Sequence, residues 1–195
     1  MIIAVDVDDV LTDFFDQLII FHNETYNTSL KIEDFQSYDT WKTWGGTRDE
    51  AISKIKKFFT SEYFDRIKPI KGSLQAIRSL EDRHKLIIVT SRLDMVAEKT
   101  MAWLRRHYQD SFKEVHFSYY DKNISKSQLC KKLGVQVIID DAEINIIECA
   151  KAGMKVLAYD RPWNSNIKSS DNIIRVHNWD EIIVEISKLE KKSTK

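Results

Sequence analysis

Cysteine, proline and glycine are scarce in this chain, and long apolar runs are absent. Two cysteines among 195 residues, Cys130 and Cys149, argue against a disulfide framework and favour a reducing compartment. With two prolines and five glycines, the sequence shows no internal repeat and no low-complexity tract. No run approaches the length of a membrane span, and the first residues predict an apolar strand instead of a basic leader. We therefore expect a cytoplasmic protein.

Charge of one sign is not in excess either. Lysine plus arginine number 30 and aspartate plus glutamate number 30, so the formal net charge is zero. This balance argues against a nucleic acid polymer or a membrane surface as the partner. Hydrophobic residues make up 43% of the chain, enough for one main core and a small second lobe.

Short runs rich in isoleucine and valine alternate with helical patterns along most of the chain. The expected strands are Ile2–Val5, Leu86–Val89, Val115–Phe117, Val137–Ile139, Val156–Ala158 and Ile173–Val176. The expected helices cover residues 73–82, 93–107, 126–133, 143–151 and 179–189. This alternation predicts an α/β fold, with a Rossmann-like parallel sheet covered by helices on both faces.

One segment breaks the alternation. Residues 14–71 have few strand signals and many aromatic side chains, and residues 49–59 have the apolar spacing of an amphipathic helix. We interpret residues 14–71 as a small helical cap inserted after the first strand. The α/β core then consists of residues 1–13 and 72–195.

Polar side chains with a potential for chemistry follow several of the expected strands. Asp6 and Asp8 follow the first strand, Thr90 and Ser91 follow the second, and Asp140 and Asp141 follow Val137–Ile139. Lys126 begins the helix that precedes that last strand. Because the carboxyl ends of parallel strands share one edge of a sheet, we expect these groups to meet there.

The chemistry of such a group is restricted. Neighbouring carboxylates raise one another's pKa, and a bound Mg²⁺, which prefers oxygen ligands, would relieve their repulsion. The Thr90 hydroxyl and the Lys126 ammonium are suited to hold a phosphate. One carboxylate could then attack phosphorus, and another could protonate the leaving alcohol.

The order of these motifs resembles that of the haloacid dehalogenase superfamily. Asp6–Val10 matches the pattern D-x-D-x-[TV], and Leu86–Thr90, Lys126 and Ile138–Asp141 match the second, third and fourth motifs. The resemblance implies that Asp6 is a nucleophile forming an aspartyl-phosphate and that Asp8 is the acid and base. It further implies that Thr90 and Lys126 hold phosphate.

The same resemblance implies the ligands of a Mg²⁺ cofactor. They are Asp6, Asp8 through its backbone carbonyl, Asp140 and Asp141. Sequence does not separate the roles of Asp140 and Asp141. Lys122 is a rival for the phosphate lysine, but the fourteen residues from Lys126 to Asp140 better fit one helix followed by one strand.

More narrowly, the chain resembles the 5′(3′)-deoxyribonucleotidases, whose first motif reads D-x-D-G-V-L-x-D-F. The resemblance implies a phosphomonoesterase acting on nucleoside or deoxynucleoside monophosphates. Phe14 falls where that family places an aromatic facing the base, and Trp41 is a second candidate for stacking, although both could instead fill the core of the cap.

Two positions depart from that family. Asp9 stands where glycine is usual, and Arg92 stands where proline often follows the Thr-Ser pair. We expect Arg92 to pair with Asp94 or to face solvent. The alternative is that Arg92 binds a second phosphate or a substrate carboxylate.

Two other functions are compatible with the sequence. One is a phosphatase of the same chemistry acting on another small metabolite, such as a sugar phosphate. The other is a catalytically idle phosphate-binding domain, against which the intact Asp6 and Asp8 argue. The sequence leaves a homodimer open.

Overall fold

Six parallel strands form the centre of the computed structural model, which describes residues 1–118 and 124–193. The strands are β1 (Ile2–Val5), β2 (Lys85–Thr90), β3 (Glu114–Phe117), β4 (Val137–Asp140), β5 (Lys155–Tyr159) and β6 (Ile173–Val176). Their order in the sheet is β3-β2-β1-β4-β5-β6. The predicted α/β fold with a parallel sheet is confirmed.

The strand order places a crevice at the sheet edge where the candidate groups were predicted. The chain runs outward from β1 through β2 to β3, and then returns to the other side of β1 as β4. The connection after β1 therefore leads toward β2 on one side, and the connection after β4 leads toward β5 on the other side. Open α/β sheets bind their ligands at the carboxyl ends of two such strands.

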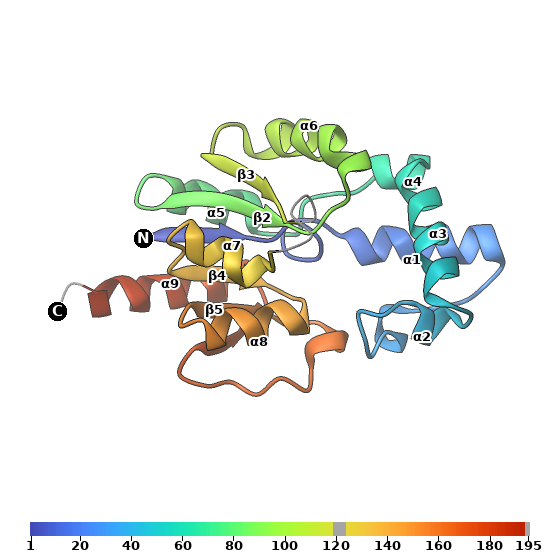
Figure 1. Cartoon of the computed structure of the whole chain (residues 1–195). Coiled ribbons are helices and arrows are strands. Elements are labelled where there is room, and N and C mark those ends of the chain that lie inside the picture. Colours follow the sequence, from blue (N-terminus) through green and yellow to red (C-terminus); the bar gives the residue numbers. More distant parts are fainter. Residues whose placement is uncertain (119–123, 194–195) are drawn as a thin grey trace.

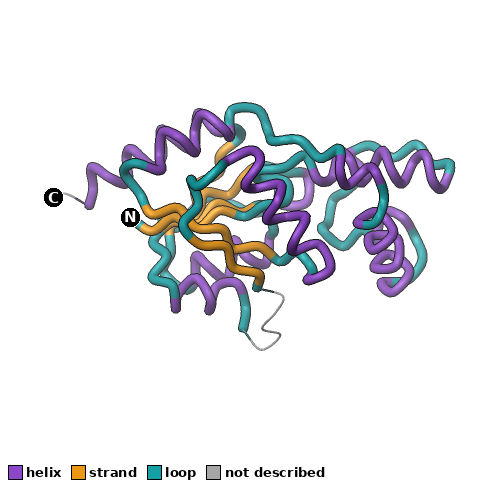
Figure 2. Tube along the Cα trace, turned by 90° about the horizontal axis from the view of Figure 1, so that it is seen from above, coloured by secondary structure: helices purple, strands orange, loops and turns teal. Residues whose placement is uncertain are grey.

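The side chains of each strand alternate between two buried faces. On one face, Ile3 and Val5 pack in a cluster that includes helices α5 (Ser73–Glu81), α6 (Ala97–Tyr108) and α9 (Trp179–Ser193). On the other face, Ala4 packs with residues of α7 (Lys126–Lys132) and α8 (Glu143–Lys151). Figure 2 shows helices on both sides of the strands. Both cysteines are free and buried in the second cluster.

Four helices between β1 and α5 lie together beyond one end of the sheet (Figure 1). They are α1 (Phe14–Tyr26), α2 (Trp41–Trp44), α3 (Arg48–Phe59) and α4 (Glu62–Asp65). Phenylalanines of α1, α3 and α4 form a buried cluster that also includes Val96 and Trp163, so the apolar side chains of this segment pack against the α/β part as well as one another. Helix α3 starts at a capping box, in which Thr47 and Glu50 satisfy each other's backbone N–H groups.

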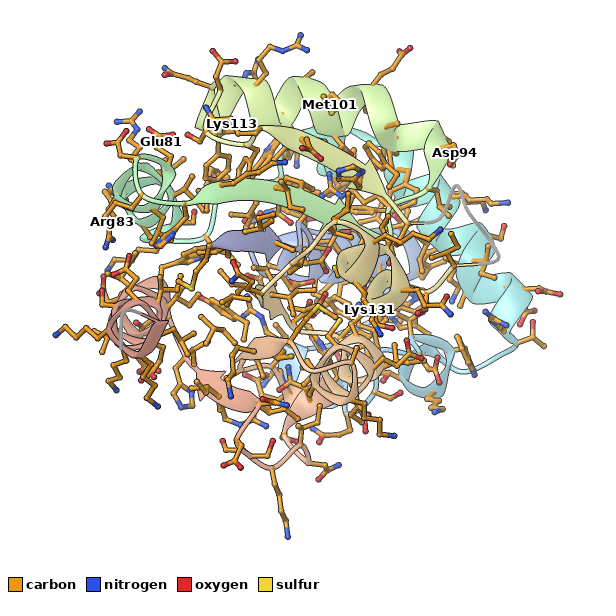
Figure 3. The ribbon with its side chains drawn as sticks, turned by 60° about the vertical axis from the view of Figure 1, so that its left-hand side comes forward. Glu81, Arg83, Asp94, Met101, Lys113 and Lys131 are labelled. Atoms are coloured by element: carbon orange, nitrogen blue, oxygen red, sulfur yellow. The ribbon has the colours of Figure 1, made fainter. Side chains whose placement is uncertain are left out.

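One predicted helix begins later than expected. The segment predicted as helical from residue 93 opens with a 3-10 turn at Asp94–Val96 and becomes α-helical at Ala97. Asp94, Arg83 and Lys113 lie at the outer edge of the molecule (Figure 3).

No helix within residues 1–118 and 124–193 combines the length and the apolar character needed to cross a bilayer.

His22 of α1 couples the stability of the helical segment to pH. It is buried against Trp44, its Nδ1 lies 2.9 Å from Thr28 Oγ1, and the Lys54 ammonium lies 3.2 Å from its Nε2. Burial, followed by the charge of Lys54, lowers the pKa of His22 to about 4. The folded chain therefore binds fewer protons than the unfolded chain between about pH 4 and 6.5.

We predict that the free energy of unfolding falls by about 2 kcal/mol through His22 alone when the pH drops from 6.5 to 4.5. Denaturant unfolding at several pH values would measure this dependence. The variant His22→Gln, which does not titrate, should be less stable at pH 7 but should lose correspondingly less stability on acidification. Equal pH dependence in the two proteins would contradict the assignment.

Candidate active site

The sheet edge collects the groups that were expected there. Asp6 follows β1, and its N–H donates to the carbonyl of Ile139 at 3.0 Å, so it continues the parallel pairing of β1 with β4. Thr90 ends β2 and Asp140 ends β4. Lys126 begins α7 one residue after Ser125, whose side chain accepts from the Gln128 N–H and fixes the start of the helix.

Lys126 lies between two carboxylates. Its Nζ is 3.0 Å from Asp6 Oδ1 and 2.7 Å from Asp140 Oδ2, and all three side chains are buried. Burial lowers the pKa of Lys126, but the charges of Asp140 and Asp6 outweigh it and raise that pKa above its usual value. Lys126 is therefore a fixed cation. The rival Lys122 lies outside the described residues.

Asp6, Asp140 and Asp141 form a buried cluster in which one oxygen of each lies within 4.8 Å of the others. Burial raises the pKa of Asp6 to about 7, although the charge of Lys126 opposes this shift. Burial and the charge of Asp9 raise the pKa of Asp141 well above its usual value. These groups are crowded without enough positive charge to compensate them.

The two acids after β4 have different surroundings. Both oxygens of Asp140 accept hydrogen bonds, from the Ala142 N–H, the Asn145 amide and Lys126. Asp141 Oδ2 accepts from the Trp163 indole at 2.8 Å, whereas Asp141 Oδ1 is buried without a hydrogen-bond partner among residues 1–118 and 124–193. An orphaned buried carboxylate oxygen is suited to bind a cation.

Asp8 is held by Arg92, a contact that we did not predict. Arg92 Nη2 lies 2.6 Å from Asp8 Oδ1, and Arg92 Nε lies 3.0 Å from the same oxygen. Arg92 is buried, while Asp94 is exposed. The expectation that Arg92 pairs with Asp94 or faces solvent is therefore wrong. The turn after β2 directs its side chain inward, toward the end of β1.

A cavity of about 460 Å³ opens over this edge of the sheet. Asp6, Asp8, Thr90, Ser91 and Arg92 line its polar end. Its apolar walls come from α1 and α3, and the lining there includes Phe14, Leu18, Ile52, Ile55 and Phe59. The cavity thus has an ionic end on the sheet, while the helical segment contributes mostly apolar side chains together with Arg48 and Lys56.

The two aromatic candidates are placed differently. Phe14 lines the cavity and also packs edge-on against Phe58, with ring centroids 5.4 Å apart, so it faces both the cavity and the aromatic cluster. Trp41 is half-buried and is not among the residues lining the cavity. It lies under the guanidinium of Arg48, which does line the cavity, with 5.8 Å from Cζ to the ring centroid.

Sequence reasoning assigned no role to several contributors. Trp163 and Arg161 come from the turn after β5, where Trp163 donates to Asp141 and Arg161 donates to the carbonyl of Asp9. Their position after a strand end was the only available signal. Asn145 lies one turn into α8 and supports Asp140, as an amide five residues after a strand-end acid can do.

Comparisons with known proteins agree with this architecture. The profile of the family described as 5′ nucleotidase, deoxy (Pyrimidine), cytosolic type C protein matches residues 1–191. A nucleotidase of Clostridium acetobutylicum is 26% identical over 193 residues, which cover 98% of this chain and 96% of the relative. A 5′(3′)-deoxyribonucleotidase of Bacillus subtilis (strain 168) is 27% identical over 184 residues, covering 93% and 95%.

Among solved structures, a haloacid dehalogenase-like hydrolase from Streptococcus pneumoniae matches with a TM-score of 0.71 at 13% identity. The match covers 95% of this chain and 97% of that protein, and it shows a shared fold. Because the family profile spans nearly the whole chain, the protein belongs to the cytosolic type C 5′-nucleotidase family, and its fold is shared with a haloacid dehalogenase-like hydrolase, as its motifs predicted.

Proposed function

We propose that this protein is a Mg²⁺-dependent phosphomonoesterase that hydrolyses nucleoside or deoxynucleoside monophosphates through an aspartyl-phosphate on Asp6. The observation that carries the proposal is the placement of Asp6 and Asp8 side by side at the ionic end of a cavity with apolar walls. The names of two relatives, a nucleotidase and a 5′(3′)-deoxyribonucleotidase, support the substrate class.

The residues support two successive displacements at phosphorus. In the first, a carboxylate oxygen of Asp6 bonds to phosphorus, the ester P–O bond breaks, and the ester oxygen takes a proton from Asp8. In the second, Asp8 takes a proton from water, the water oxygen bonds to phosphorus, and the bond from phosphorus to Asp6 breaks. Inorganic phosphate leaves, and both carboxyl groups return to their starting state.

Other residues hold the phosphoryl group and the carboxylates. We assign phosphate binding to Lys126 and to Thr90 and Ser91, which line the cavity. Lys126 already contacts Asp6 Oδ1 at 3.0 Å, so its charge lies next to the oxygen atoms on which negative charge develops. Asp140 supports this role by fixing the ammonium from the other side.

A Mg²⁺ ion fits the donor set. Asp6, Asp140 and Asp141 offer three clustered oxygens, and the orphaned Asp141 Oδ1 is the group that most needs a cation. When bound, the metal would neutralise the acids and polarise the phosphate oxygens. We propose Asp6, Asp141 and the backbone carbonyl of Asp8 as ligands, with Asp140 chiefly orienting Lys126.

The cavity suits a small substrate that has a phosphate at one end and a flat, apolar group at the other. Its volume of about 460 Å³ is within the range for small-molecule sites. We propose that residues 14–71 act as a cap that covers the substrate, with Phe14 against the base. Trp41 would not touch the substrate but would support Arg48, which lines the cavity. A cytoplasmic location remains a prediction, and the oligomeric state stays open.

We predict that Asp6→Asn lowers kcat by about a thousandfold or more, because the amide does not form the phosphoryl-enzyme bond. Phosphate binding should be largely retained. The measurement is phosphate release from a panel of nucleoside monophosphates, sugar phosphates and an aryl phosphate, with Mg²⁺ and then with EDTA. The matched control is Asp82→Asn, an exposed acid after α5, which should keep full activity.

The same panel separates the alternatives. Phosphate release mainly from deoxynucleotides would support the nucleotidase function. Release mainly from sugar phosphates would change the proposed substrate class but keep Asp6 as the nucleophile. Turnover that survives Asp6→Asn removes Asp6 as the nucleophile. No release from any phosphate leaves a phosphate-binding domain.

We also predict that Mg²⁺ raises the unfolding temperature, since an ion that binds only the folded state stabilises it by about 2.7 kcal/mol at a hundred times its Kd. Asp141→Asn should raise the stability of the metal-free protein by removing a crowded acid, yet it should lose most of the gain from Mg²⁺. Thermal unfolding with Mg²⁺ and with EDTA measures both effects.

The exposed Asp94→Asn variant is the control for this prediction, and its response to Mg²⁺ should match that of the wild type. An unchanged response in Asp141→Asn would exclude Asp141 as a ligand.

A further inference from the structure

Arg92 is a buried cation that lies next to the reacting groups. It is 4% exposed and lies two residues beyond Thr90, where the chain leaves β2. Its guanidinium donates to Asp8 from Nε and Nη2, and its Nη1 donates to Thr100 Oγ1 at 3.0 Å. Two turns of chain that are 84 residues apart are thereby joined at the acid of the reaction.

The contacts to Asp8 are unequal. Asp8 Oδ1 accepts from Arg92 Nη2 at 2.6 Å and Nε at 3.0 Å, and from the Thr12 hydroxyl at 3.4 Å. Within residues 1–118 and 124–193, Asp8 Oδ2 accepts only from Arg92 Nε, at 3.2 Å. Oδ1 is therefore the more firmly held oxygen, and Oδ2, with one longer contact, is the oxygen better suited to exchange a proton in the cavity that Asp8 lines.

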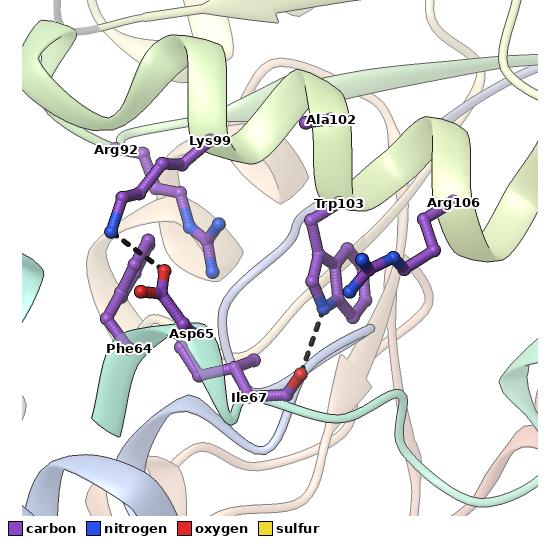
Figure 4. A pocket seen from close by; sticks show the side chains of 8 residues that line it. All are labelled: Phe64, Asp65, Ile67, Arg92, Lys99, Ala102, Trp103 and Arg106. Carbon is purple, nitrogen blue, oxygen red and sulfur yellow. Dashed lines mark hydrogen bonds and ion pairs between the residues drawn. The ribbon is translucent and has the colours of Figure 1, made fainter. Parts of the chain in front are cut away.

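The guanidinium is itself held on its far side. Thr100 Oγ1 donates to the Val96 carbonyl at 2.8 Å, which leaves its lone pairs facing Arg92. The rings of Phe64 and Phe14, from the helical segment, lie 5.2 and 6.0 Å from the guanidinium carbon. Figure 4 shows Arg92 beside Phe64, beneath α6.

Two contacts close this side by joining α6 to the end of the helical segment. Lys99 pairs with Asp65 at 2.7 Å, and the Trp103 indole donates to the Ile67 carbonyl at 3.0 Å (Figure 4). The Asp8 carboxylate is thus connected through Arg92 to α6 and to the packed phenylalanines. Because the guanidinium is planar and its partners are fixed, Arg92 sets the orientation of the Asp8 carboxylate as well as supplying a positive charge.

We propose that Arg92 is a positioning residue that aims Asp8 Oδ2 at the leaving oxygen of the substrate, and that Thr100 holds Arg92 in this orientation. The inference rests on the proposed function, in which Asp8 protonates that oxygen. Arg92 takes no part in the proton transfer, because its guanidinium remains charged throughout. The proton moves from Asp8 to the ester oxygen as the ester P–O bond breaks.

A positioning role for the acid has a signature that depends on the leaving group. An alcohol needs the proton as it departs, whereas p-nitrophenolate departs well without one. The value of kcat/KM covers the steps through departure of the alcohol or phenol, so it isolates the step that requires the acid. The informative quantity is the ratio of kcat/KM for a deoxynucleoside 5′-monophosphate to kcat/KM for p-nitrophenyl phosphate.

We expect Arg92→Gln to lower this ratio tenfold or more, with Arg92→Lys and Thr100→Val lowering it less. Asp8→Asn should lower it most, and the double variant Asp8→Asn/Arg92→Gln should be no worse than Asp8→Asn alone, since the two residues act as one unit. Arg106→Gln, an exposed arginine of α6 near the same contacts, is the matched control and should leave both rates unchanged.

If Arg92→Gln fails to fold, Thr100→Val and Arg92→Lys carry the test. Equal losses on both substrates would overturn the proposal in favour of a structural ion pair. A rise in KM for the nucleotide alone, with kcat retained, would overturn it in favour of binding to a second anion. Additive losses in the double variant would also overturn it. Failure of the proposed function is recognised separately, by a wild-type protein that releases no phosphate or by turnover that survives Asp6→Asn.

Discussion

The ammonium of Lys126 between Asp6 and Asp140 is the contact on which the site depends. It joins the ends of β1 and β4, the two neighbouring strands between which the strand order reverses, and it is buried with both partners. Removing one partner of a buried ion pair costs about 3–5 kcal/mol because the remaining charge is left uncompensated. Even with Lys126 present, one Asp141 oxygen has no hydrogen-bond partner in the part of the chain that the structure describes, so the described residues do not balance the negative charge at this edge. The missing positive charge explains why the same cluster is suited to a divalent cation.

The sheet and the strand-end groups could be predicted because they depend on local patterns. Ile3 and Val5 face one cluster and Ala4 faces the other, which is the alternation expected of a strand buried on both faces. The interval from Lys126 to Asp140 also carried usable information, because one helix and one strand fit within it. The partner of Arg92 could not be found in this way. Asp94 is its neighbour in sequence, but Asp8 becomes its neighbour only when β1 and β2 pair. Trp163 and Asp141 meet for the same nonlocal reason.

The helical segment shows a different limit of sequence reasoning. Its many aromatics could either stack on a substrate or fill a core, and the sequence did not decide between these roles. Phe14 lines the cavity and also packs against Phe58, so it contributes to both. Trp41 lies at the surface of the same segment and reaches the cavity only by way of Arg48. Periodicity identifies the buried face of a helix, but it does not distinguish a face buried by protein from one that borders a cavity.

Asp9 connects the end of the first motif to the start of α1, and its contacts account for the one departure from the motif D-x-D-G that the chain resembles. Its φ is +57°, a left-handed conformation that glycine adopts freely and that costs other residues about 1–2 kcal/mol. Aspartate is among the few side chains that tolerate it, and here the Asp9 carboxylate accepts from the Phe15 N–H at 3.1 Å, near the start of α1. Its carbonyl accepts two bonds from Arg161. Burial, opposed by the charge of Arg161, raises the pKa of Asp9 well above its usual value. The strain and the buried carboxyl are therefore offset by contacts that fix α1, and with it Phe14, relative to Asp8. Glycine at this position would relieve the backbone but would remove the side chain that anchors the helix over the site.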